Sequence, residues 1–120
     1  MSQETDAILN SLLSVAGSEG AVILSGKGDV IDSKFNNSEM KSQFDDEIKE
    51  LVAFVNSLSD RENFGDPLQI FVQGSENQIL IYRIDSGPYY VLVLGTSSMK
   101  TGFIGIAIEK TIPLFKNLRI

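Results

Sequence analysis

Three short segments of the sequence are almost entirely apolar, and each is bounded by residues that favour turns. They are residues 21–24, 79–84 and 89–94. Consecutive strand residues point to opposite faces of a sheet, so such a strand is apolar on both faces, which is typical of a sheet covered on both sides. The sequence therefore predicts a sheet between two layers of helices.

Five strands are predicted, and short turn sequences separate them. The strands are residues 21–24, residues 30–33, Leu68–Gln73, Gln78–Ile84 and Tyr89–Leu94. The first two flank a Gly-rich turn at Ser25–Asp29, and the connections at residues 74–77 and 85–88 are rich in Gly, Asn, Asp, Ser and Pro. Connections this short join antiparallel neighbours, so we expect a five-stranded antiparallel sheet.

Apolar residues recur at helical spacing in three further segments. These are residues 5–16, 38–58 and 100–112. Thr5 and Ser38 stand where N-caps are expected, residues 34–37 are expected to form a loop, and Pro113 is expected to end the last helix because it lacks a backbone N–H. The order is α-β-β-α-β-β-β-α, and we expect a three-layer α/β/α domain over residues 1–120, with the middle helix alone on one face.

The residue types argue against catalysis. The chain contains no Cys and no His, which removes reactive thiols, the usual general base near neutral pH and the commonest transition-metal ligand. The segment Gly26–Gly28 is too short for a phosphate-binding loop. Asp29 and Asp32, the carboxylates of the first hairpin, are too few for a metal site, and Asp32 is expected to face solvent. We therefore expect no catalytic residue, metal or cofactor, and a chain that is not an enzyme.

The charge is negative and unevenly distributed. The net charge is −6, with 13 acidic and 5 basic residues in positions 1–66 but 3 acidic and 5 basic residues in positions 67–120. This balance argues against binding to nucleic acid or to an anionic membrane surface, both of which need clustered Lys and Arg. Without a signal-peptide pattern or an apolar run of about 18 residues, we expect a cytoplasmic protein with no membrane insertion.

The middle helix carries a wider apolar stripe than one core requires. Its central members are Met40, Phe44, Ile48, Leu51, Val55 and Leu58. Measured from Phe44 at about 100° per residue, Val52 falls near +80° and Phe54 near −80°. The usual core-facing stripe is somewhat over 100° wide. A second subunit or embedding between loops would cover the excess, and the first alternative predicts a helix-mediated dimer.

The strand Leu68–Gln73 reads as an edge strand. One of its faces carries Gln69, Phe71 and Gln73 and is only partly apolar. No Pro, Lys or inward-pointing charge protects it against pairing. Two outcomes are open, which are sheet extension across a dimer and an ordinary edge covered by a loop.

These two features define a candidate protein interface. It consists of Phe44, Ile48, Leu51, Val52, Phe54, Val55, Gln69 and Phe71. We expect Val52→Glu or Phe54→Glu to dissociate a dimer without unfolding the domain.

The middle helix also carries acidic residues at positions 45–47 and 50. They form either a solvated helix face or a patch that steers a basic partner.

The element order and two local segments resemble the roadblock / dynein light chain family. Residues 21–33 (AVILSGKGDVIDS) resemble the family's first hairpin, and residues 101–105 (TGFIG), after a strand-rich region, resemble the entry to its last helix. The resemblance implies the roadblock (profilin-like) fold.

The resemblance also implies a homodimer or heterodimer in which long helices and edge strands pair, here residues 38–58 and 68–73. It implies an adaptor or regulator of Ras-like small GTPases, since bacterial members regulate a polarity GTPase in motility and eukaryotic members serve in dynein and lysosomal scaffolds. Two alternatives are a structural scaffold subunit without GTPase contact and a small-ligand sensor.

Overall fold

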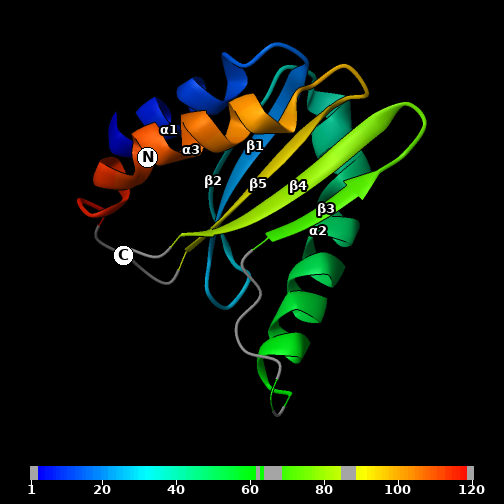
Figure 1. The fold of residues 1–120 in the computed structure, drawn as a ribbon, viewed down its shortest axis with the longest axis vertical. Coiled ribbons are helices and arrows are strands. Elements are labelled where there is room, and N and C mark those ends of the chain that lie inside the picture. The colour runs from blue at the N-terminus through cyan, green and yellow to red at the C-terminus, as the bar shows by residue number, and fades with distance from the viewer. Residues whose placement is uncertain (1–2, 62, 64–68, 85–88, 119–120) are drawn as a thin grey trace.

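The computed structural model describes residues 3–61, 63, 69–84 and 89–118, and its elements follow the predicted order (Figure 1). The helices are α1 Gln3–Leu13, α2 Ser38–Ser59 and α3 Thr101–Phe115, and the strands are β1 Ser18–Ser25, β2 Val30–Phe35, β3 Gln69–Gln73, β4 Asn77–Ile84 and β5 Tyr89–Thr96. The prediction of three helices and five strands is confirmed.

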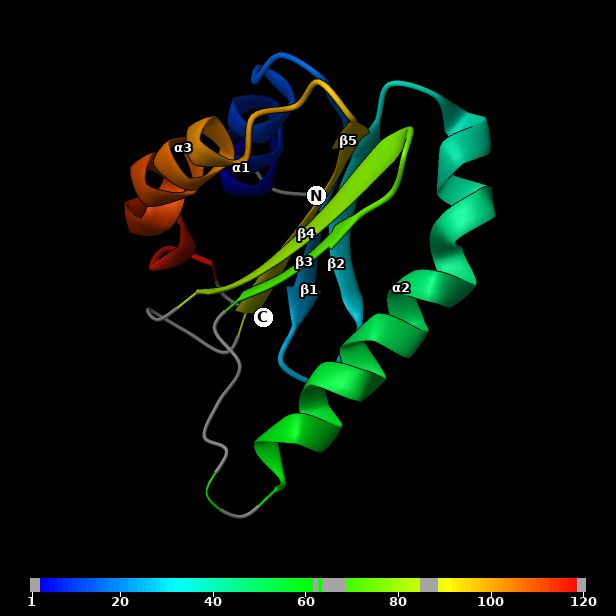
Figure 2. The ribbon, with the colours of Figure 1, turned by 45° about the vertical axis from the view of Figure 1, so that its right-hand side comes forward.

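The strands form one antiparallel sheet in the order β2-β1-β5-β4-β3. Helices α1 and α3 lie side by side on one face of this sheet, and α2 lies alone on the other face (Figure 2). The predicted three-layer α/β/α arrangement and the division of the helices between its layers are therefore confirmed.

The central strands pack against both helical layers, which explains their continuous apolar runs. In β1, Ala21 and Ile23 belong to the core under α1 and α3, whereas Val22 and Leu24 belong to the core under α2. All four side chains are at most 1% exposed. Alternation along one strand thus supplies apolar surface to two separate cores, and this burial is the main favourable contribution to folding.

A glycine shapes the β1–β2 hairpin. Gly28 has φ +96, a left-handed conformation that only glycine adopts readily, and its N–H donates to the carbonyl of Ser25 at 3.0 Å. A Cβ atom at this position would lie 2.7 Å from Cγ1 of Val52 on α2. The turn therefore needs glycine both for its backbone and for the close approach of α2.

Two predicted caps are wrong. Thr5 lies inside α1, which begins at Gln3, and its side chain is buried, so it is not a cap. At α2, the cap is Asn37, whose Oδ1 accepts a hydrogen bond from the Glu39 N–H at 2.8 Å, and Ser38 is already helical. Asn and Ser are nearly equal as N-caps, so local preference cannot choose between neighbours.

The predicted ends of several elements also shift. Helix α3 continues past Pro113 to Phe115, whose 1% exposed ring contacts Tyr89 at a centroid distance of 5.7 Å. Burial of this large side chain offsets the hydrogen bond that proline removes. Strand β2 includes Lys34 and Phe35, which were predicted as loop, because both pair with β1. Leu68 lies outside the described residues.

Candidate interaction surface

Strand β3 lies at the edge of the sheet, as predicted. It pairs with β4 on one side, and its other side faces no strand in the described part of the chain. Its residues are exposed except for half-buried Ile70. An exposed strand edge presents unpaired backbone N–H and C=O groups, which can pair with a strand of another chain.

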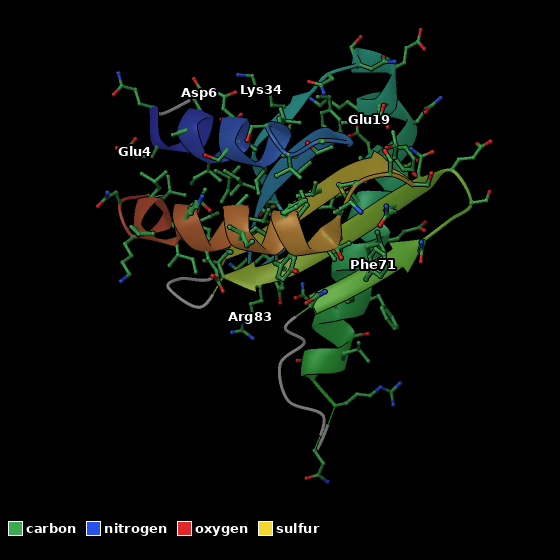
Figure 3. All side chains as sticks on the ribbon, turned by 45° about the horizontal axis from the view of Figure 1, so that its top comes forward. Glu4, Asp6, Glu19, Lys34, Phe71 and Arg83 are labelled. Carbon is green, nitrogen blue, oxygen red and sulfur yellow. The ribbon has the colours of Figure 1, made fainter. Side chains whose placement is uncertain are left out.

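The two faces of β3 belong to different layers. Gln69, Phe71 and Gln73 pair with β4 residues whose side chains face α1 and α3, whereas Ile70 and Val72 lie on the side of α2. Figure 3 labels Phe71 on β3, near α3. The predicted interface therefore combined residues from opposite faces of the sheet. The exposed apolar side chain of β3 on the α2 side is Val72, which is 44% exposed and which was not among the predicted interface residues.

Helix α2 directs three of the predicted interface residues into the chain's own core. Ile48, Val52 and Val55 are at most 4% exposed and pack on the sheet. Phe44 and Leu51 are half-buried against the same core, while Phe54 is 55% exposed.

The expectation that Val52 lies outside the core is wrong. Val52 packs over the β1–β2 hairpin, where its Cγ1 occupies the space above Gly28. Phe54 lies on the opposite flank of the helix, where its ring is largely exposed. Of the two flanks proposed from the width of the stripe, the structure leaves only the Phe54 flank open to a partner.

The acidic residues of α2 are exposed. The described exposed charges on this helix include Asp45, Asp46, Glu47 and Glu50, together with Lys41 and Lys49. Four carboxylates against two ammonium groups give this exposed face a negative local potential.

Asp32 is buried, which contradicts its expected exposure. It is 5% exposed on β2, and one carboxylate oxygen accepts from the Ser33 N–H at 2.8 Å. Its Oδ2 has no hydrogen-bond partner among the described residues. The described residues contain no group of three or more His, Cys, Asp or Glu side chains able to hold a metal ion.

Tyr82 lies on β4 directly opposite Gln69 of the edge strand. Burial raises the pKa of its hydroxyl above the ordinary tyrosine value, because the charged form is poorly solvated there. A tyrosine hydroxyl is protonated at neutral pH even at its ordinary pKa, so Tyr82 can donate a hydrogen bond there.

In the described part of the chain, no helix is long and apolar enough to span a bilayer.

No protein-family model and no curated protein matches the sequence. Solved structures do match. MglB of Myxococcus xanthus superposes with a TM-score of 0.76 at 12% identity, covering 95% of this chain and 93% of MglB. A Roadblock/LC7 domain from Streptomyces avermitilis gives a TM-score of 0.64 at 17% identity, covering 90% of this chain and 91% of that domain.

A further structure, described as MglB with a tetrameric arrangement, gives a TM-score of 0.73 at 9% identity and covers 97% of this chain and 90% of the other. Identities this low establish the fold and not the activity. The chain has the fold of the Roadblock/LC7 domain.

Proposed function

We propose that this chain forms a homodimer through α2 and the outer edge of β3, and that the dimer binds a Ras-like small GTPase as a non-catalytic adaptor or regulator. The observation that carries the dimer is the exposure of Phe54 and Val72 on the α2 side of the sheet, together with the unpaired edge of β3.

A second copy would satisfy both features at once. Antiparallel pairing of two β3 strands around a two-fold axis would use the free backbone groups of each edge and extend the sheet across both subunits. The same axis would bring the two α2 helices to one side of the joined sheet. Phe54 and Val72 would then lose contact with water, which favours association by about 25 cal/mol for each Å² of apolar surface buried.

The GTPase partner is supported by the fold. The chain shares its fold with MglB and with a Roadblock/LC7 domain. Its element order and two local segments resemble the roadblock family, and that resemblance implies a regulator of a Ras-like GTPase. Such a regulator acts by binding one conformation of the GTPase more tightly than another, which requires no catalytic residue of its own. The exposed acidic face of α2 would attract a partner with a basic surface.

Solution mass tests the dimer. By light scattering at micromolar concentration we expect twice the 13.2 kDa chain mass for the wild type and a single-chain mass for Phe54→Glu/Val72→Glu. The matched control is Val30→Glu, which places the same charge at a 52% exposed valine on the opposite edge strand and should stay dimeric. A monomeric wild type would refute the dimer.

Binding and turnover assays test the GTPase. Ras-like GTPases encoded in the same genome are mixed with the protein in the GDP state and with a non-hydrolysable GTP analogue, and binding and GTP hydrolysis are measured. We expect binding that differs between the two nucleotide states. If the protein is dimeric but binds no GTPase in either state, the scaffold alternative replaces this proposal.

A further inference from the structure

The outward face of α3 carries exposed apolar side chains that the core does not use. The buried stripe of α3 includes Ile104, Ile108 and Phe115. Phe103 and Ile106 point away from it and are 56% and 51% exposed. Isolated exposed apolar residues are common, but a cluster marks a contact surface.

These side chains stand between two hollows in the molecular surface. One hollow, of about 380 Å³, lies between α1 and α3 and is lined by residues that include Val15, Phe103 and Ile106. The other, of about 590 Å³, lies between α3 and the sheet edge and is lined by Phe71, Phe103 and Ile106 among others. Three of the six exposed large apolar side chains in the described chain thus surround one hollow.

The charged residues that line the two hollows are basic, in contrast to the acidic chain as a whole. The residues lining the two hollows include Lys100 and Lys110 and no acidic residue, in a protein of net charge −6. Both lysines are exposed. Lys100 is the N-cap of α3 and Lys110 lies ten positions further on, so they stand about 15 Å apart along the helix axis. The surface therefore complements an elongated, acidic and apolar partner.

The backbone around the first hollow favours a helical partner. Helices α1 and α3 satisfy their main-chain hydrogen bonds internally, so this hollow offers no strand edge to pair with. A segment docking there must satisfy its own backbone groups, and a helix does so. Apolar side chains spaced i, i+3, i+4 and i+7 along one helix could enter both hollows, on either side of the ridge formed by Phe103 and Ile106.

We infer that the α1–α3 face binds an acidic amphipathic helix of a partner protein, with apolar side chains in the two hollows and carboxylates facing Lys100 and Lys110. This site lies across the sheet from α2 and shares only Phe71 with the interface predicted from the sequence. It does not depend on dimerisation or on GTPase binding.

A synthetic helix serves as the probe. It is a fluorescein-labelled peptide of about 16 residues, long enough to span both lysines, with Leu at the four spaced positions, Glu on both flanks and Ala elsewhere. The controls are a scrambled peptide of the same composition and a peptide with Lys in place of Glu. We expect anisotropy titrations to show about tenfold tighter binding of the acidic helix than of either control.

Variants locate the binding. Phe103→Ser/Ile106→Ser should weaken the acidic peptide about tenfold, while Val30→Ser, at a similarly exposed apolar residue on the far edge, should not. Lys100→Gln/Lys110→Gln should weaken binding about threefold at low salt and reduce its salt dependence.

A chemical-shift titration locates the contact directly. The amide resonances of the wild-type protein that shift when the acidic peptide is added should belong to Ser11–Ala16 and to α3. Solution mass and thermal midpoint are measured for every variant, so that unfolding or monomer formation is recognised.

Several outcomes would overturn the proposal. They are the absence of peptide binding, equal binding of the acidic and basic peptides, and amide shifts confined to α2 and β3. Sedimentation with anionic phosphatidylglycerol vesicles that is lost in Phe103→Ser/Ile106→Ser would reassign the face to a membrane. A lower mass of that variant would reassign it to contact between copies. The vesicle result would leave the test of the α2–β3 dimer unchanged, whereas a lower mass of the variant would place a contact between copies on α3.

Discussion

The two flanks of α2 look equivalent on a helical wheel and differ completely in the structure. Val52 and Phe54 lie at about +80° and −80° from the centre of the apolar stripe. Val52 is 2% exposed and Phe54 is 55% exposed. The width of an apolar stripe therefore shows that a helix has more than one contact, but not which flank faces the core.

The difference arises from what lies under each flank. On the Val52 side, the β1–β2 hairpin turns beneath α2, and Gly28 leaves space that the Val52 methyl group fills. The core partners of α2 include Val22, Leu24 and Ile81, which belong to the inner strands. The Val52 flank of the helix thus packs against the hairpin, and the Phe54 flank is left largely exposed.

Val52→Glu is the substitution with the largest expected effect. A carboxylate in this apolar core would be desolvated without a partner, so we expect the free energy of unfolding to fall by about 4 kcal/mol or more, a large part of the stability of a typical domain. Urea denaturation followed by circular dichroism measures it. We therefore expect Val52→Glu to destabilise the domain itself and not to release a stably folded monomer.

Val30→Glu is the matched control, because Val30 is 52% exposed on β2. Its free energy of unfolding should change by less than about 0.5 kcal/mol. A Val52→Glu protein as stable as this control would show that the Val52 flank is not core.

Most of the fold could be predicted from the sequence because its signals are local. The two-sided apolar runs of β1, β4 and β5 and their short connections specify a covered antiparallel sheet. Which flank of α2 faces the core could not be predicted, because it depends on contact with a hairpin that is distant in sequence from Val52. For β3, strict alternation along the strand is sufficient to place Phe71 and Val72 on opposite faces of the sheet.

Gly28→Ala tests the contact between the β1–β2 hairpin and the Val52 flank of α2, and it should lower the free energy of unfolding by an intermediate amount. A side chain at φ +96 is strained, and its Cβ would lie 2.7 Å from Val52 Cγ1, so we expect a loss of about 2 kcal/mol in the free energy of unfolding. Gly102→Ala is the control, because nothing lies within 4 Å of the added atom. That control should gain up to about 1 kcal/mol from helix propensity.

A double-mutant cycle separates strain from packing at this contact. If the Val52 methyl group causes part of the Gly28→Ala loss, Gly28→Ala/Val52→Ala should be less destabilised than the sum of its single variants by about 0.5 kcal/mol or more. If the two effects are strictly additive, the whole loss in the free energy of unfolding comes from backbone strain at position 28. The contact between Gly28 and Val52 would then not explain why this flank of α2 packs against the hairpin.

Phe54→Ser should have the smallest effect on the chain alone, and it tests the open flank. Since the ring is 55% exposed, we expect the free energy of unfolding at high dilution to change by less than about 0.5 kcal/mol. A native dimer is stabilised by mass action, so the wild-type urea midpoint should rise as protein concentration increases. The Phe54→Ser midpoint should rise less, because removing an apolar contact at the interface weakens the dimer. Equal concentration dependence in the two proteins would show that Phe54 lies outside the dimer contact, and the α2 flank would then need another partner.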